Sequence, residues 1–189
     1  NRGDATSHLG TARDLKAYFN RQLTLPTLKD FDLSHPKNPI KVTLEDYEGT
    51  LRYSGVTLRA LKVSSSPDWL KWKLKAIDLE PINNIVDVTN YVLHSLGQPM
   101  HAFDAKVVRD LIIVKRLPSG TPFITLDGKE RKLSDQDLMI CNNEGGICIA
   151  GVFGGKKSGV TNETTDIFLE SACFSPEHIR STSQRHGLN

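Results

Sequence analysis

The chain has 189 residues, enough to bury a substantial core, and carries 24 lysines and arginines against 22 aspartates and glutamates. The formal net charge of +2 gives no strong attraction to polyanions, so composition neither requires nor excludes nucleic acid as a partner. No segment approaches the roughly 20 apolar residues of a membrane span, and no signal peptide is recognisable, so we expect a cytoplasmic protein without a membrane partner.

The cysteines argue against a disulfide framework. Cys141, Cys148 and Cys173 are odd in number and lack the CxxC spacing of zinc sites. We therefore expect three reduced thiols, and since the carboxylates lack metal-ligand spacing as well, no metal site is predicted. The chain begins at Asn1 without an initiating methionine, which is typical of a fragment.

The first part of the chain predicts a helix and then a linker. Apolar residues at helical spacing favour a short amphipathic helix over residues 7–19, with Thr6 or Ser7 as its cap. Two prolines and an asparagine within six residues make 34–39 the best candidate for a linker, because they disfavour helix and central strand.

A hairpin and a second helix are predicted next. Residues 40–46 and 51–63 carry β-branched and aromatic side chains, and the step 48–50 between them suits a hairpin turn. Ser66 followed by Pro67 is typical of a helix start. The core-facing side of this helix is expected to consist of Leu70, Leu74 and Ile77.

The stretch 81–104 combines a long helix signal with a cluster of polar residues. Apolar residues recur at helical spacing and predict a mostly buried helix, which Gly97 ends and Pro99 prevents from continuing. One flank of this helix is polar, and it is either a solvated stripe or the wall of a polar pocket. The flank consists of Asn83, Asp87, Asn90 and His94.

The remainder of the chain predicts consecutive short strands and a final helix. Asp127 and Gly128 are the strongest hairpin signal in the chain, and the helix is expected to run from Ser175 and Pro176 to about Arg185. Consecutive strands beside segregated helices favour an α+β fold with mixed or antiparallel strands. The predicted strands cover residues 111–115, 121–126, 129–133, 138–141, 147–150 and 166–169.

Three features could carry chemistry, and each also has an ordinary structural explanation. GVFGG at 151–155 lacks the glycine order of a nucleotide phosphate loop and fits a turn. Glu170, at the end of an apolar strand, would by itself be an exposed charge. His101 would by itself be a hydrogen-bonded structural residue, and the sequence supplies no geometry that links it to a serine or cysteine nucleophile.

Four motifs in order resemble one known family. VDVTNYVLHSLGQPMHAFD from Val86, LDGKE from Leu126, GVFGG from Gly151 and FLESACFSP from Phe168 are similar to the editing domain of the bacterial phenylalanyl-tRNA synthetase beta subunit. The resemblance covers nearly the whole chain. It implies that residues 36–189 are the editing domain, truncated at its C-terminal end, and that residues 1–35 are a helical segment from a neighbouring domain.

The resemblance implies hydrolysis of mischarged tyrosyl-tRNA(Phe) at the aminoacyl ester. Glu170 then accepts a hydrogen bond from the para-hydroxyl of the tyrosyl group, a hydroxyl that phenylalanine lacks. His101 and Asn90 position the substrate and water, and Thr89 and Gly154 shape the pocket. An arginine of the family's pocket is replaced by Glu80, so its contact cannot be carried over.

The resemblance also implies partners and cofactors. The partners are tRNA(Phe) and the synthetase alpha subunit, in a parent enzyme of two alpha and two beta subunits. The parent uses ATP and magnesium for synthesis in its other subunit, and this fragment is expected to need no cofactor. The chain ends at Asn189, before residues that help to complete the family's pocket. Two alternatives stay open: a non-catalytic tRNA-binding or subunit-scaffolding module, and a small-molecule hydrolase.

Overall fold

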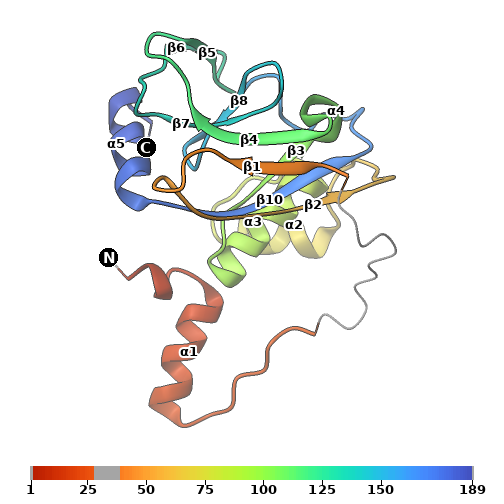
Figure 1. Ribbon diagram of the computed structural model, residues 1–189. Helices are drawn as coiled ribbons and strands as arrows, with labels where there is room; N and C mark the ends of the chain where they lie inside the picture. Colours follow the sequence, from red (N-terminus) through yellow and green to blue (C-terminus); the bar gives the residue numbers. More distant parts are fainter. Residues whose placement is uncertain (1, 28–38, 189) are drawn as a thin grey trace. The chain divides into compact units, whose positions relative to one another are not determined.

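Residues 2–27 and 39–188 are described by the structure, a computed structural model (Figure 1). Its contacts divide the chain into two compact units. Unit 1 consists of Asn1–Asn38 and Ser64–Met100, and unit 2 consists of Pro39–Val63 and His101–Asn189. The linker predicted over 34–39, apart from Pro39, and the predicted boundary after residue 35 lie outside the described residues, so both stay predictions.

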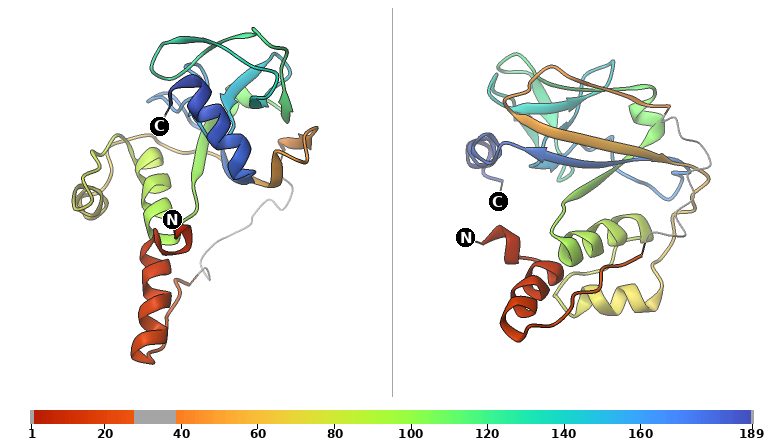
Figure 2. Two further views of the ribbon diagram at one scale, coloured as in Figure 1. Left: turned by 90° about the vertical axis from the view of Figure 1, so that its left-hand side faces the viewer. Right: turned by 60° about the horizontal axis from the view of Figure 1, so that its bottom comes forward.

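Unit 1 is helical. Its helices are α1 (His8–Phe19), which follows the short 3-10 helix η1 (Gly3–Ala5), α2 (Asp68–Lys75) and α3 (Asn84–Leu96) (Figure 2). The Ser7 side chain accepts a hydrogen bond from the Gly10 amide, which confirms the predicted cap of α1. α2 and α3 lie side by side, and the rings of Trp69 and Tyr91 meet edge to face with 5.6 Å between their centroids.

The ends of α2 and α3 lie close to the predicted signals. Pro67 was expected at the first helical position and is instead the N-cap of α2, which begins one residue later. α3 ends at Gly97, whose φ of 83° is left-handed as the sequence predicts. Leu70 and Leu74 are buried, but Ile77 is 37% exposed, so its assignment to the core side was wrong. It lies two residues beyond the last residue of α2, where the helical spacing no longer fixes its direction.

The prediction that α3 is mostly buried was also wrong. Its buried residue is a polar one, Asp87, whereas Val88 is 47% and Leu96 46% exposed. The Asp87 carboxylate accepts hydrogen bonds from Ser66 Oγ at 2.5 Å and from the Ile82 amide at 2.8 Å. These bonds offset the loss of hydration on burial, so this part of the polar flank ties the preceding loops to the helix.

Unit 2 contains two sheets and a separate hairpin, and the predicted α+β class is confirmed. The five-stranded sheet has the order β1 (Lys41–Leu44), β4 (Leu111–Arg116), β7 (Leu138–Cys141), β8 (Gly146–Ile149) and β9 (Phe153–Gly154). The three-stranded sheet has the order β2 (Thr50–Leu58), β10 (Ile167–Phe174) and β3 (Met100–Asp104). β5 (Pro122–Ile124) and β6 (Glu130–Lys132) form the hairpin, and α4 (Ala105–Val108) and α5 (Pro176–His186) complete the unit.

The main core of unit 2 lies between its two sheets (Figure 1). Ile112 and Val114 of β4 and Ile140 of β7 meet Phe103 of β3 and Phe168 of β10, and all five are fully buried. A second cluster joins the other side of the five-stranded sheet to the β5–β6 hairpin through Phe123, Leu133, Met139, Cys141 and Ile149. Residues that point between the sheets are therefore shielded from water on both sides.

The hairpin predicted between residues 40–46 and 51–63 was wrong. Both strands form, but β1 pairs in parallel with β4, while β2 pairs antiparallel with β10. Asp46 shapes the connection, because its carboxylate accepts hydrogen bonds from the Gly49 amide at 2.7 Å and from Arg116 Nε at 2.5 Å. The short connection thus passes from one sheet to the other.

The other local predictions are confirmed. β5 and β6 pair across a turn in which Gly128 has a φ of 78°, and β7 pairs antiparallel with β8. α5 begins at Pro176, as predicted. Within residues 2–27 and 39–188, every helix is too short or too polar to cross a bilayer.

Gly55 of β2 allows the buried Phe168 ring to approach the strand. A Cβ at this position would lie 2.0 Å from Phe168 Cζ, and Phe168 is fully buried. We expect Gly55→Ala to lower the free energy of unfolding by about 3 kcal/mol, because a close-packed core cannot absorb the extra methyl group. Thermal unfolding should show a fall of roughly 6 to 12 °C. The matched control is Gly159→Ala, whose new Cβ would make an ordinary contact at 3.5 Å, and equal melting temperatures for the two variants would contradict this account.

Candidate functional site

His101 and Glu170 share one face of the three-stranded sheet in unit 2. His101 lies two positions before Phe103 on β3, and Glu170 lies two positions after Phe168 on β10. Both phenylalanines belong to the core between the sheets. Because residues two apart on a strand point to the same side, both polar side chains are directed toward the space between the sheets.

The His101 ring is held against apolar neighbours. Its centroid lies 4.4 Å from that of the Phe103 ring, in an edge-to-face arrangement. Burial lowers the pKa of His101 to about 4, so the imidazole is neutral at neutral pH. Its Nε2 is buried and has no hydrogen-bond partner among the described residues. A buried, unpartnered ring nitrogen can take a hydrogen bond from water or from a ligand.

Gly154 makes room beside this ring. A Cβ on Gly154 would lie 3.2 Å from His101 Cε1, 3.5 Å from His101 Nε2 and 2.8 Å from Leu126 Cδ1. The φ of Gly154 is not in the left-handed region, so space rather than backbone conformation is what this position requires. The predicted pocket residues His101 and Gly154 are thus brought together.

Glu170 is buried, which is unlike the exposed charge that its strand-end position alone suggests. Glu170 is 6% exposed, and Tyr53 Oη donates a hydrogen bond to Glu170 Oε2 at 2.6 Å. Burial raises the pKa of Glu170 to about 7, and the hydrogen bond from Tyr53 opposes this rise. The nearby Cys148 thiol has its pKa raised by its own burial and by Glu170, so it is neutral.

Thr89 and Asn90 lie on α3, which belongs to unit 1. The Thr89 hydroxyl donates a hydrogen bond to the Val86 carbonyl oxygen at 2.7 Å, which leaves its oxygen able to accept another. Asn90 is half-buried, and Glu80 is exposed. The roles predicted for Thr89 and Asn90 stay predictions.

Tyr53 is the residue of this site that sequence reasoning missed. It lies in a predicted strand, and no pattern links it to Glu170, which is 117 positions later. Alternation along β2 could have placed Tyr53 and Gly55 on one face, but only the pairing of β2 with β10 brings that face to Glu170.

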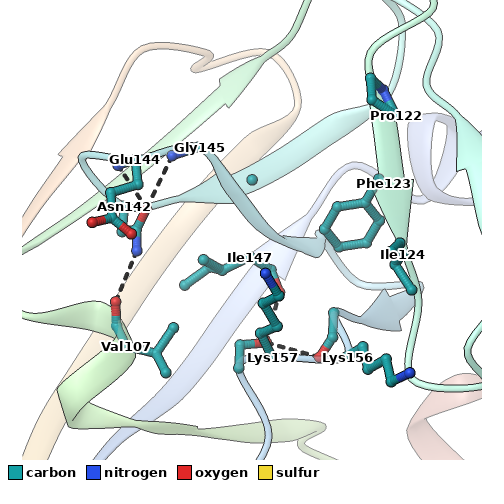
Figure 3. Close-up of a pocket in the computed structure, with 13 residues that line it drawn as sticks. Val107, Pro122, Phe123, Ile124, Asn142, Glu144, Gly145, Ile147, Lys156 and Lys157 are labelled. Atoms are coloured by element: carbon teal, nitrogen blue, oxygen red, sulfur yellow. Dashed lines mark hydrogen bonds between the residues drawn. The ribbon is translucent and has the colours of Figure 1, made fainter.

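A separate cavity of about 290 Å³ is lined by residues of β5, of β8 and of the loop that follows β9 (Figure 3). Its walls include Phe123, Ile147 and Gly155, and Lys156 and Lys157 diverge from its edge. A Cβ on Gly155 would meet the Ile147 carbonyl oxygen and the Phe123 ring, whereas one on the preceding glycine would meet His101. None of the five predicted site residues lines this cavity.

Comparison with known proteins supports the resemblance given by the motifs. A family model described as "B3/4 domain" matches residues 49–189. Phenylalanine-tRNA ligase beta subunits are 54% identical to the chain in Bacteroides fragilis, 53% in Bacteroides thetaiotaomicron and 42% in Fusobacterium nucleatum, over 100% of this chain. The chain spans 24% of the length of these relatives. The similarity to the bacterial beta subunit is therefore confirmed.

A solved structure gives the same fold. An N-terminal fragment of the phenylalanyl-tRNA synthetase beta subunit from Pyrococcus horikoshii matches with a TM-score of 0.52 over 95% of this chain and 55% of that chain. The two sequences are 14% identical, so this likeness concerns the fold alone.

Proposed function

Because the chain belongs to the B3/4 domain family, we propose that it is the editing region of a phenylalanyl-tRNA synthetase beta subunit and hydrolyses the ester of tyrosyl-tRNA(Phe). We assign this activity to residues 36–189 and take residues 1–35 as part of a neighbouring domain. The need for such a reaction is physical, since a site built for phenylalanine rejects a ligand with one more hydroxyl by only about 100-fold.

The observation that carries the proposal is the buried, unpartnered Nε2 of His101 beside Gly154. A neutral imidazole can accept a hydrogen bond from water and take its proton as the water oxygen attacks the ester carbonyl. The bond from the carbonyl carbon to the ribose oxygen then breaks, and the proton passes to that oxygen. The small Gly154 leaves volume for the aminoacyl group.

Glu170 supplies the preference for tyrosine in this proposal. A bound tyrosyl group can donate a hydrogen bond from its hydroxyl to the buried carboxylate of Glu170. A bound phenylalanyl group has no hydroxyl and makes no such bond. A site that recognises a hydroxyl discriminates against its absence by roughly 10⁴-fold. Such a site therefore spares correctly charged phenylalanyl-tRNA.

The partners follow from the same proposal. The substrate is tRNA(Phe) carrying the wrong amino acid, and the chain acts within an assembly of two alpha and two beta subunits in the cytoplasm. Hydrolysis of an ester by water needs no nucleotide, so the ATP and magnesium of the parent ligase take no part in it.

The test is the release of tyrosine from tyrosyl-tRNA(Phe) by the complete synthetase that contains this chain. We expect His101→Ala to slow the single-turnover rate by about 100-fold, because it removes the group that accepts the proton from water. Ligation of phenylalanine and binding of tRNA should be unchanged. The control is His8→Ala, which removes an exposed histidine of α1.

Two outcomes would overturn the proposal. If the complete enzyme binds tRNA(Phe) but releases no tyrosine, the chain is a binding or scaffolding module. If it hydrolyses free tyrosyl esters equally well without tRNA, the chain is a small-molecule hydrolase. An unchanged rate in His101→Ala would remove His101 from the reaction while leaving the activity in place.

A further inference from the structure

Tyr53 is placed against Glu170 by the pairing of β2 and β10. In this register Glu170 lies opposite Gly55, and Tyr53 lies opposite Ala172, so the tyrosine is a diagonal neighbour of the carboxylate on the same face. Tyr53 Oη reaches Glu170 Oε2 at 2.6 Å. The Tyr53 ring also meets the Phe174 ring edge to face, at 6.4 Å between centroids, which fixes its direction.

A carboxylate has two oxygens, and Tyr53 occupies one. We propose that Tyr53 is a positioning residue that holds Glu170 by Oε2, so that Oε1 takes the para-hydroxyl of the substrate and the site selects hydroxylated aromatic side chains. This inference rests on the proposed editing function. It gives Tyr53, itself a tyrosine, a role in selecting the tyrosyl group of the substrate.

Tyr53 is the neighbour of Glu170 that favours the ionised form of its carboxyl group. Tyr53 of β2 and Cys148 of β8 interact with it, and His101 of β3 lies on the same face of the three-stranded sheet. Burial keeps both Cys148 and His101 neutral at neutral pH. The pKa of Tyr53 is raised by burial and by Glu170, so its hydroxyl stays protonated and remains a donor. Of these groups, Tyr53 is the one that stabilises the ionised carboxylate.

The consequence is a specific pH dependence. The pKa of Glu170 is raised to about 7, so tyrosine selection is full above this pH and weakens as pH falls through it, because the protonated carboxyl group accepts a weaker hydrogen bond. A hydrogen bond to a charged group favours the ionised form by about 10- to 100-fold. Loss of the Tyr53 hydroxyl should therefore move the midpoint upward by about one to two pH units.

The experiment measures single-turnover hydrolysis of tyrosyl-tRNA(Phe) and phenylalanyl-tRNA(Phe) by the complete synthetase between pH 5.5 and 9, after subtraction of uncatalysed hydrolysis. For Tyr53→Phe we expect the midpoint of the tyrosyl reaction to rise and the preference for tyrosine at pH 7 to fall by about 5- to 50-fold, as a shift of one to two pH units requires. The preference should recover toward pH 9. Tyr47→Phe is the matched control, because Tyr47 is 73% exposed.

A second variant and a double mutant test the Tyr53 hydroxyl independently of Tyr53→Phe. Fluorotyrosine at position 53 preserves the ring and makes the hydroxyl more acidic, so the midpoint should move down. In the Glu170→Gln background, Tyr53→Phe should have no further effect on the pH profile. If the midpoint of the pH profile is the same in Tyr53→Phe, in the fluorotyrosine variant and in the unmodified enzyme, the proposed role of Tyr53 is overturned. Failure of the editing function itself is distinguished because the unmodified enzyme would then release no tyrosine at any pH.

Discussion

Glu170→Gln in the complete synthetase should reduce the preference for tyrosyl-tRNA(Phe) over phenylalanyl-tRNA(Phe) by about 100- to 1,000-fold. The amide has the shape of the carboxylate, but it carries no charge, so its hydrogen bond with the substrate hydroxyl is weaker. Most of the loss should appear in kcat/KM for the tyrosyl substrate. The phenylalanyl substrate should react no more slowly, because it makes no bond to Glu170.

Protein stability distinguishes this effect from damage to the fold. The pKa of Glu170 is raised from 4.5 to about 7 in the folded protein. A carboxyl group with a raised pKa favours folding at low pH, and this contribution is lost as pH rises from 4.5 through 7. Replacing it with an uncharged amide should therefore leave the melting temperature at pH 8 the same or higher.

The measurement is single-turnover release of both amino acids at pH 8, alongside thermal unfolding. Glu163→Gln makes the same chemical change at an exposed loop position and should alter neither result. Equal discrimination in Glu170→Gln and the unmodified enzyme would show that the para-hydroxyl is recognised elsewhere. Lower stability at pH 8 would show that the carboxylate is needed for folding.

Local sequence signals predicted the parts of the fold that depend on local contacts. Gly97 ends α3 and Gly128 turns the β5–β6 hairpin, because each supplies a left-handed conformation that its neighbours cannot. The strand pair before α2 was predicted as a hairpin and is not one. Its true partners, β4 and β10, lie far along the chain, and a strand pattern does not specify which strand it joins.

The burial of polar residues escaped prediction for a related reason. Asp87 was predicted on a polar flank, and its burial depends on Ser66, which is 21 positions earlier. Glu170 and Tyr53 meet through sheet pairing across 117 positions. The site residues were predicted from motif similarity. The neutral state of His101 and the hydrogen bond from Tyr53 that favours ionised Glu170 depend on the folded core, so the sequence did not predict them.

Asp137 should make the largest contribution of any charged residue to the stability of unit 2. It is fully buried before β7, and its ion pairs join that loop to the end of α5. Its carboxylate is paired with Arg185, accepts a hydrogen bond from the Ser134 amide at 2.8 Å, and lies 2.6 Å from His186 Nε2. Asp137→Asn removes the charge that both basic side chains face.

We expect Asp137→Asn to lower the free energy of unfolding by about 2 to 4 kcal/mol, toward the lower end of the range for broken buried pairs because the Arg185 side chain is 33% exposed. Burial alone would raise the pKa of Asp137, but the Ser134 amide, His186 and Arg185 outweigh it, so the pKa is lowered from 3.8. The stabilisation is therefore present above pH 3.8 and is lost as pH falls through the lower, folded-state pKa.

Denaturant unfolding at a series of pH values measures the loss of unfolding free energy in Asp137→Asn and the direction in which this loss changes with pH. The difference between Asp137→Asn and the unmodified protein should stay nearly constant from pH 7 to pH 5, begin to narrow below about pH 4, and close below the folded-state pKa, where both proteins lack the charge. Asp135→Asn, an exposed neighbour in the same loop, should match the unmodified protein throughout. A difference that widens toward acid would mean that Asp137 is protonated in the folded state, and the ion pairs that join α5 to the sheet would then contribute nothing.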